Sequence, residues 1–266
     1  MSELFRKTRT SSYLEISDWK RKGITAGITT RKGGFSQKPY DTLNMGFHVQ
    51  DDYDLVLKNY KRMENIIGIP ARYWISSKQV HGTDVLEWDD SLNRDNITHP
   101  PDFELEYDGW MTNQRNVLLT GVFADCVPLF FRSEEWIALA HAGWKGTVKG
   151  MGPEVIDHFL AHHVPLEEIE VVVGPSISSR YYEVDDRVVQ HIPFDMQTED
   201  VLTRSDETHY YLDLKQLHKN LLLKKGLKEQ QITLTNYCTY EDGDLFFSHR
   251  RDQGKTGRMM AFIGFK

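Results

Sequence analysis

Two long apolar runs near the middle of the chain constrain its fold more than any other feature. The first reads NVLLTGVFADCVPLFF over residues 116–131, and the second reads EEWIALAHAGW over residues 134–144. Short apolar stretches bounded by turn residues are typical of strands that are buried on both faces of a sheet. Neither run approaches the roughly 20 apolar residues that span a bilayer. We therefore expect buried strands in a globular core and no membrane segment.

Shorter patterns predict the remaining elements. Further strands are expected at residues 23–30, 73–80, 84–90 and 169–175, with two more around a basic loop within residues 244–265. Helices are expected at residues 51–68, 150–163 and 213–226. Surface loops are expected at residues 31–48 and 91–108, where glycine, proline and polar residues gather.

The order of these elements indicates the fold class. Strands and helices mix without the regular alternation that a doubly wound parallel sheet requires, so we predict an α+β fold. A length of 266 residues suits one large domain or two small ones. Residues 1–22 precede the first predicted strand and are expected to form an N-terminal extension.

Composition narrows the class of protein further. The net charge of -7 argues against nucleic-acid binding, which usually needs a basic field. The two cysteines, Cys126 and Cys238, exclude a disulfide framework and favour a reducing compartment. The N-terminal segment contains no apolar core of the length found in secretory signals. We therefore expect a cytoplasmic protein that binds neither nucleic acid nor membrane.

Three side chains that can bind a metal lie at the ends of predicted strands. They are His81 in QVHG, Cys126 in ADCVP and His141 in AHAGW. Strand ends are places where side chains from distant segments converge on a pocket. One cysteine and two histidines would give zinc three protein ligands and an open fourth position, as in a catalytic site. Their wide spacing leaves plainer interpretations open: a small core residue at Cys126, a loop histidine at His81 and a core histidine at His141.

Cys126 and His141 also suit a different chemistry. A histidine beside a cysteine can activate the thiolate as a nucleophile, and Asp125 could join this pair if the chain turns there. Such a metal-free hydrolase would have no role for His81. A non-enzymatic metal-binding or partner-binding protein is a third interpretation, and the residue pattern leaves all three open.

A basic segment near the C-terminus suits either a solvated loop or an anion site. Its GKTG at residues 254–257 does not predict a nucleotide-binding P-loop, because His249 stands where that motif needs a glycine. The basic residues of the segment are Arg250, Arg251, Lys255 and Arg258. If strands flank the loop, Arg250 and Arg258 point inward and Arg251 points to the other face.

Seven ordered motifs resemble one known family over nearly the whole chain. They read TTRKGGFSQKPYDTLNMGFHVQDD, QVHG, DGWMT, ADCVPLFF, AHAGWKGT, GPSISSRYYEV and FFSHRRDQGKTGR. Together they resemble the YfiH/YlmD family, also called the laccase-domain or multicopper-oxidase-like family. Its members are described as purine nucleoside phosphorylases and have been linked to peptidoglycan editing.

This resemblance implies that residues 1–266 form a single α+β domain in which mixed β-sheets pack with flanking helices. It also implies one metal ion bound by His81, Cys126 and His141. Zinc is the expected metal, since a laccase needs several copper centres and therefore many more histidine ligands. The implied activity is phosphorolysis of adenosine, inosine and methylthioadenosine, with adenosine deamination as a second reaction. Purine nucleosides and phosphate are the partners that this activity implies.

Within that activity we expect Asp125 and Cys126 to be catalytic. Asn44, in the first motif, and Arg250 and Arg258, in the last, are expected to contact the substrate. Arginine makes planar, bidentate contacts with phosphate oxygens, and an acidic protein needs a local cationic patch to hold a dianion. The segment around Arg31 is the alternative position for that patch.

Overall fold

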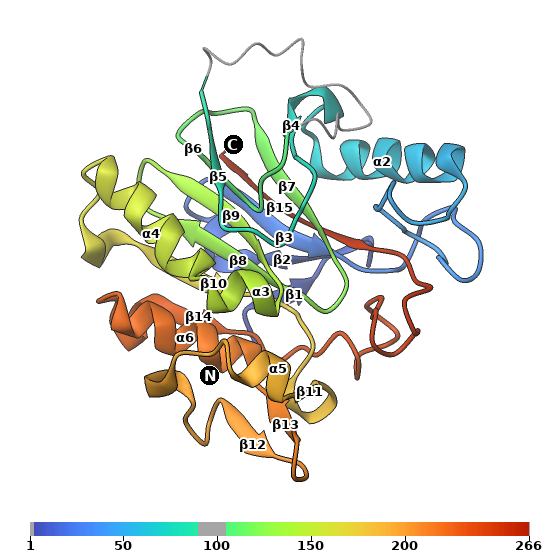
Figure 1. Cartoon of the computed structure of the whole chain (residues 1–266). Coiled ribbons are helices and arrows are strands. Elements are labelled where there is room, and N and C mark those ends of the chain that lie inside the picture. The colour runs from blue at the N-terminus through green and yellow to red at the C-terminus, as the bar shows by residue number, and fades with distance from the viewer. Residues whose placement is uncertain (1–2, 90–104, 266) are drawn as a thin grey trace.

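The computed structural model describes residues 3–89 and 105–265, which form one mixed α/β domain built around two six-stranded sheets (Figure 1). The first sheet contains, in spatial order, β1 (Phe5–Lys7), β2 (Tyr13–Ile16), β3 (Ile24–Thr29), β15 (Met259–Phe265), β7 (Leu118–Phe123) and β4 (Trp74–Ile75). The second contains β14 (Ile232–Leu234), β10 (Glu170–Val173), β8 (Val127–Arg132), β9 (Ile137–Ala142), β6 (Gly109–Thr112) and β5 (Val85–Trp88). A third, small sheet contains β11 (Glu183–Asp185), β13 (His209–Leu212) and β12 (Leu202–Arg204). Most pairs are antiparallel, whereas β4–β7, β5–β6 and β10–β14 are parallel.

The helices of the described residues lie outside the two large sheets. They are α1 (Ser17–Lys20), α2 (Tyr53–Ile67), α3 (Trp144–Val148), α4 (Met151–Ala161), α5 (Asp186–Val189) and α6 (Leu214–Lys224). Short 3-10 turns lie at Ala71–Tyr73, Leu166–Glu168, Ser179–Tyr181, Phe194–Met196 and Glu229–Gln231. None of these helices combines the length and apolar character needed to cross a bilayer.

The two large sheets pack face to face. Successive side chains along a strand point alternately into the core between the sheets and toward the helices outside them. In β9, Ile137 and Leu139 point between the sheets, and the alanines between them face the helices. The same alternation turns His141 toward the space between the sheets. There its ring lies 5.3 Å from the ring of Phe123, which belongs to β7 of the other sheet.

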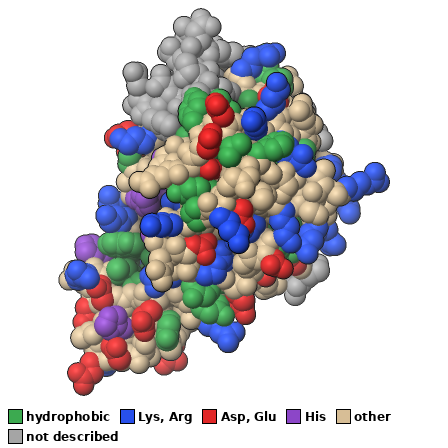
Figure 2. All heavy atoms as spheres, turned by 90° about the vertical axis from the view of Figure 1, so that its right-hand side faces the viewer, with side chains coloured by type: hydrophobic (Ala, Val, Ile, Leu, Met, Phe, Trp, Pro, Cys, Tyr) green, Lys and Arg blue, Asp and Glu red, His purple; other side chains and the backbone are tan. Residues whose placement is uncertain are grey.

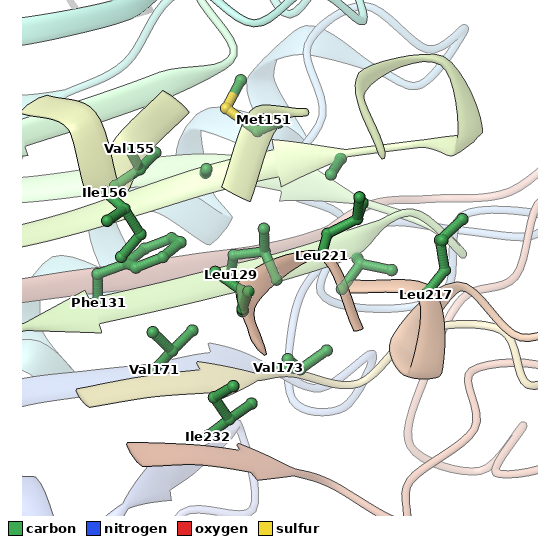
Figure 3. Packing of buried hydrophobic residues seen from close by; sticks show 14 of the residues in the cluster. Leu129, Phe131, Met151, Val155, Ile156, Val171, Val173, Leu217, Leu221 and Ile232 are labelled. Carbon is green, nitrogen blue, oxygen red and sulfur yellow. The ribbon is translucent and has the colours of Figure 1, made fainter. Parts of the chain in front are cut away.

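The outer face of the second sheet is covered by α4 and α6. Figure 3 shows Val155 and Ile156 of α4 and Leu217 and Leu221 of α6 over this face of the sheet. The strand side chains in the same cluster include Leu129, Phe131, Val171, Val173 and Ile232. Full burial of one such side chain contributes roughly 1.5–3 kcal/mol. This cluster therefore fixes the two helices to the sheet.

The outer face of the first sheet is covered by α2, which lies away from α4 and α6 in Figure 1. Asp52 caps the start of α2, where its carboxylate accepts hydrogen bonds from the N–H groups of Asp54 and Leu55, and Gly68 caps the end with a φ of 81°. These are the capping interactions that the two ends of a helix require.

Asn59 of α2 ties the long loop at residues 31–48 to the domain. Its Oδ1 accepts a hydrogen bond from Phe35 N (2.8 Å), and its Nδ2 donates to Ser36 Oγ (3.0 Å) and to Asn44 O (2.8 Å). The loop packs so closely here that a Cβ at Gly34 would lie 2.2 Å from a main-chain oxygen. Only glycine fits that position.

Most of the expected elements are confirmed. The first apolar run forms β7 and β8 with a turn between them, and the second forms β9. The three predicted helices correspond to α2, α4 and α6, and the strands predicted at residues 23–30, 84–90 and 169–175 correspond to β3, β5 and β10. The predicted α+β class with mixed sheets and flanking helices is therefore the observed architecture.

Three local expectations differ from the structure. Residues 244–265 contain one strand, β15, and residues 245–247 are buried in an irregular segment rather than in a second strand. The strand expected at residues 73–80 is reduced to β4, only two residues long. Residues 5–20 form β1, β2 and α1 within the domain, so they are more than an extension. Most of the loop predicted at residues 91–108 lies outside the described residues.

Replacing Asn59 by alanine is expected to lower the free energy of unfolding by about 2–4 kcal/mol, because it leaves several buried polar groups of the loop without partners, each at a cost of about 1–3 kcal/mol. Urea unfolding followed by circular dichroism measures this change. Lys58→Ala is the matched control, since Lys58 is the neighbouring exposed residue on the same helix. Equal stability of the two variants would contradict the role given to Asn59.

Candidate active site

His81, Cys126 and His141 converge beside the start of β8 and the end of β9. One ligand atom from each residue lies within 4.8 Å of the ligand atoms of the other two. The pairing of β8 with β9 produces this proximity, because Pro128 lies opposite His141 and Cys126 immediately precedes β8. The ring of His81 meets that of His141 edge-on, with centroids 4.9 Å apart. Segments far apart in the sequence thus form one group.

Asp108 orients both histidines. Its Oδ1 lies 2.7 Å from His141 Nδ1, which leaves Nε2 of that ring as the remaining ligand atom. Its Oδ2 accepts hydrogen bonds from Val80 N (3.0 Å) and Gly82 N (2.7 Å), on either side of His81. The Asp108 side chain is completely buried. One carboxylate therefore positions two of the three candidate ligands.

Two site residues adopt backbone conformations that are uncommon for residues with side chains. φ is 60° at His81 and 83° at Asp125, within the left-handed region. Strained backbone of this kind is kept where surrounding contacts hold it, and it clusters at functional sites. At Asp125 the conformation makes the turn between β7 and β8, so Asp125 and Cys126 can both reach the same cavity.

The carboxylate of Asp125 is bonded within the protein. Oδ1 accepts a hydrogen bond from Thr239 Oγ1 (2.6 Å). Oδ2 accepts hydrogen bonds from Ser248 Oγ (3.0 Å) and Arg250 N (2.7 Å). Asp125 therefore joins the turn that carries Cys126 to the basic segment near the C-terminus.

Gly143 gives the metal-ligand group the room it needs. A Cβ at this position would lie 3.0 Å from Cys126 Sγ and 3.0 Å from Cδ2 of His81. These contacts are tighter than most carbon atoms tolerate, so a larger residue would push the two ligands apart. Glycine here allows α3 to start directly beside the site.

The electrostatic surroundings favour charged forms of Cys126 and His141. Burial alone would raise the pKa of the Cys126 thiol, but the charge of His141 and hydrogen bonds from His141 and His81 outweigh it and lower this pKa below its usual range. Burial alone would lower the pKa of His141, but the Cys126 thiolate and the hydrogen bond with Asp108 raise it. The sulfur is therefore held as a thiolate, which is both the metal-binding and the nucleophilic form.

A cavity of about 240 Å³ opens beside this group. It lies between α3 and the segment that leads into the small third sheet. The residues that line it are His81, Asp125, Cys126, Gly143, Trp144, Lys145, Ile177, Tyr182 and Leu214. Polar and ionisable groups thus meet apolar walls, as is usual where a small molecule binds.

The arginines expected at the site lie outside the lining of this cavity. The Arg250 guanidinium is 5.1 Å from the ring of Tyr182 and donates to Glu183 O (3.1 Å). Arg258 Nη1 donates to Thr256 O (2.8 Å) and Gly257 O (3.1 Å).

The inference that Arg251 alternates to the opposite face of a strand is wrong, because no strand forms there. Its guanidinium instead donates to the main-chain oxygens of Thr239, Tyr240 and Phe246 and pairs with Asp252. Arg251 therefore holds the segment together. Arg31, the alternative anion residue, also bonds main-chain oxygens, those of Asp41 and Gly243.

Asn44 is completely buried, and its amide is used within the protein. Oδ1 accepts hydrogen bonds from Gly46 N (2.9 Å) and Arg258 N (2.9 Å). Nδ2 donates to Gly46 O (3.3 Å) and Asp51 Oδ2 (2.8 Å). Asn44 thus anchors the main chain of Arg258. Direct contact between Asn44 and a substrate stays a prediction.

Sequence reasoning missed Asp108, Lys145 and Tyr182. Each lies within a quoted motif, DGWMT, AHAGWKGT or GPSISSRYYEV, but no spacing rule distinguishes it from a surface residue. Asp108 offered one usable sign: it immediately precedes a buried strand, where a carboxylate needs a partner. Lys145 and Tyr182 offered none before the fold brought their segments together.

The donor set fits one transition-metal ion. Imidazole nitrogen and thiolate sulfur suit zinc or copper, whereas magnesium and calcium prefer oxygen ligands. The contact between Asp108 and His141 is the carboxylate–histidine interaction that usually supports a metal ligand. A single group of three ligands is also too small for the several copper centres of a laccase.

Comparisons with known proteins agree with this fold. Residues 25–266 match the family described as multi-copper polyphenol oxidoreductase laccase. The chain is 39% identical to the purine nucleoside phosphorylase YlmD of Bacillus subtilis (strain 168), over 97% of this chain and 96% of that protein. It is 35% identical to the purine nucleoside phosphorylase SSP1584 of Staphylococcus saprophyticus, over 99% of this chain and all of that protein.

Solved structures give the same result. The crystal structure of YlmD from Geobacillus stearothermophilus superposes with a TM-score of 0.92 at 35% sequence identity and covers the whole of both chains. The hypothetical protein YfiH of Bacillus licheniformis superposes with a TM-score of 0.91 at 36% identity, over 98% of this chain and 99% of that one. The chain therefore belongs to the family described as multi-copper polyphenol oxidoreductase laccase, to which the resemblance with YfiH and YlmD pointed.

Proposed function

We propose that this protein is a zinc-dependent purine nucleoside phosphorylase. Its proposed substrates are adenosine, inosine and methylthioadenosine, with phosphate, and its proposed second reaction is adenosine deamination. The observation that carries the proposal is the group of His81, Cys126 and His141 beside a cavity with polar and apolar walls. Curated relatives that match over nearly their full length are named purine nucleoside phosphorylases, which supports the same activity here. The proposed location is the cytoplasm.

The reaction sets clear demands on the pocket. An oxygen of phosphate bonds to C1′ of the ribose while the bond between C1′ and the purine N9 breaks. The electron pair of that bond goes to the purine, which takes up a proton, and the products are ribose 1-phosphate and the free base. The pocket must hold a dianion beside a sugar and stabilise charge on the leaving base. A bound zinc ion would supply Lewis-acid polarisation there.

The residues expected to act on the substrate have distinct proposed roles. Asp125 lines the cavity, and three protein hydrogen bonds leave about one of its roughly four acceptor positions for a substrate hydroxyl. Cys126 acts as the thiolate ligand of the metal. Arg250, stacked on Tyr182, contacts substrate from the rim. Arg258, held by Asn44, supplies positive charge near Cys126 and Asp125.

Zinc content tests the metal. Purified protein is expected to contain about one zinc per chain, and Cys126→Ala is expected to lose it, because one of only three protein ligands is removed. Asp108→Asn should weaken zinc affinity about 10–100-fold, since the partner that orients a ligand is changed. Competition with a chromogenic chelator measures both effects. Full zinc retention in Cys126→Ala would sink the proposed site.

Asp84→Asn provides the matched control for Asp108→Asn. Asp84 is an exposed residue on the segment that follows His81. The substitution removes one carboxylate from the same part of the structure. Its zinc affinity should equal that of the unchanged protein. A similar loss in both variants would mean that net charge, rather than the orientation of the histidines, sets the affinity.

Phosphate-dependent cleavage of adenosine tests the reaction. Adenine and ribose 1-phosphate should appear in phosphate buffer and not in a buffer without a nucleophilic anion. Chromatography of the base and of labelled ribose measures both products. Release of free ribose alone would show a hydrolase instead. Inosine formed from adenosine without phosphate would support the proposed deamination.

A second candidate function follows from the contact between Asp108 and His141. Cys126, His141 and Asp108 form a line of nucleophile, base and orienting carboxylate, which is the arrangement of thiol hydrolases. That enzyme would act without a metal and would not need His81. Chelator treatment distinguishes the two, since it should abolish phosphorolysis but leave a thiol hydrolase active. Ready alkylation of Cys126 in protein as purified would favour the hydrolase.

A further inference from the structure

The first turn of α3 contributes an exposed lysine, Lys145, to the lining of the cavity. Trp144 and Lys145 both line it, next to Gly143 and Cys126. The Nζ of Lys145 lies 5.7 Å from the centroid of the Trp144 ring. Within residues 3–89 and 105–265, no carboxylate forms an ion pair with Lys145. Its charge is therefore available to a ligand.

The arginines near the site are less suited to hold an anion inside the cavity. Arg250, Arg258 and Arg31 each donate to main-chain oxygens, and none of them lines the cavity. Guanidinium groups held in this way keep only part of their donor set for a ligand. Lys145 is the one lysine or arginine among the described residues that form the lining.

The helix that carries Lys145, α3, is bonded to α6. Thr147 Oγ1 donates to Gly143 O (2.9 Å) and lies 3.0 Å from Nε2 of His218 on α6. Burial lowers the pKa of His218 to about 3, so its ring stays neutral and can donate from Nε2 to Thr147. Thr147 and His218 are completely buried. This contact fixes the first turn of α3, and with it the backbone of Lys145.

The lining of the cavity contains a carboxylate, so a cation there would favour phosphate binding. The carboxylate belongs to Asp125, which repels a dianion. The protein as a whole carries a net charge of -7, and on the face shown in Figure 2 the basic side chains are interspersed with acidic ones. Phosphate binding in this cavity therefore benefits from a cation in the lining, and Lys145 is the lysine that the lining provides.

We propose that Lys145 is the phosphate-binding residue of this pocket, with its ammonium group in contact with the dianion that attacks the nucleoside. The kinetic consequence of this inference rests on the proposed phosphorylase activity, whereas the binding of inorganic phosphate does not. A lysine on a rigid helical turn gives a point charge that can follow the phosphate as its bond to the sugar forms.

Binding of inorganic phosphate, measured by calorimetry on the zinc-loaded protein, tests the site directly. Lys145→Gln should raise the dissociation constant at least about tenfold, the effect expected for one charged hydrogen bond. Lys145→Arg should restore most of the affinity. Lys149→Gln, which removes an exposed lysine from the other end of the same helix, should change it less than about twofold. The proposal would be overturned if the dissociation constant for phosphate is unchanged in Lys145→Gln or if Lys149→Gln loses as much affinity. It would also be overturned if the unchanged protein does not bind phosphate.

Kinetics separates this inference from the proposed function. Lys145→Gln should raise the KM for phosphate much more than the KM for adenosine, whereas Lys149→Gln should leave both unchanged. A KM for phosphate that does not move would count against Lys145. If phosphate binding depends on Lys145 but no phosphorolysis occurs in the unchanged protein, the phosphorylase activity fails and the anion site stands.

Discussion

Asp108 holds together the segments on which the whole site depends. It bonds the ring of His141 through one oxygen and the main chain on both sides of His81 through the other. Burial alone would raise its pKa, but these hydrogen bonds outweigh it and keep the pKa below the usual range for a carboxyl group. A carboxylate buried without partners would be costly, so the two histidine segments and Asp108 stabilise one another.

The side chains of Cys126 and His141 can bind a metal ion together, or they can share protons with each other. In both cases Cys126 is a thiolate and His141 lies between it and Asp108. Metal binding displaces protons from its ligands, so the two states compete for one arrangement of side chains. The position of His81 distinguishes these two states. His81 lies outside the line of Cys126, His141 and Asp108, yet Asp108 bonds the main chain on both sides of it and its backbone keeps an uncommon conformation.

The sequence was informative where burial dictates residue type and less so where contacts are made by irregular chain. Continuous apolar runs predicted β7, β8 and β9, and the pattern of residues 51–68 predicted α2. The strand-end positions of His81, Cys126 and His141 left a shared site open, the family resemblance implied it, and the structure brings their ligand atoms together. The segment from Leu245 to Phe247 was misassigned because apolar residues can be buried by packing without strand pairing. The direction of Arg250 depended on that strand, so it was beyond prediction, as were Asp108 and Lys145, whose partners come from distant segments.

The central place of β15 in the first sheet bears on how the chain is made. β15 pairs with β3 on one side and β7 on the other, although more than a hundred residues separate it from β7 in the sequence. A ribosome that adds roughly 5–20 residues per second leaves both neighbours without their partner for several seconds or more. During that time, exposed strand edges of a half-built sheet can pair with other nascent chains. Synthesis of this protein therefore includes a stage in which the edges of β3 and β7 lack their native partner and are open to aggregation.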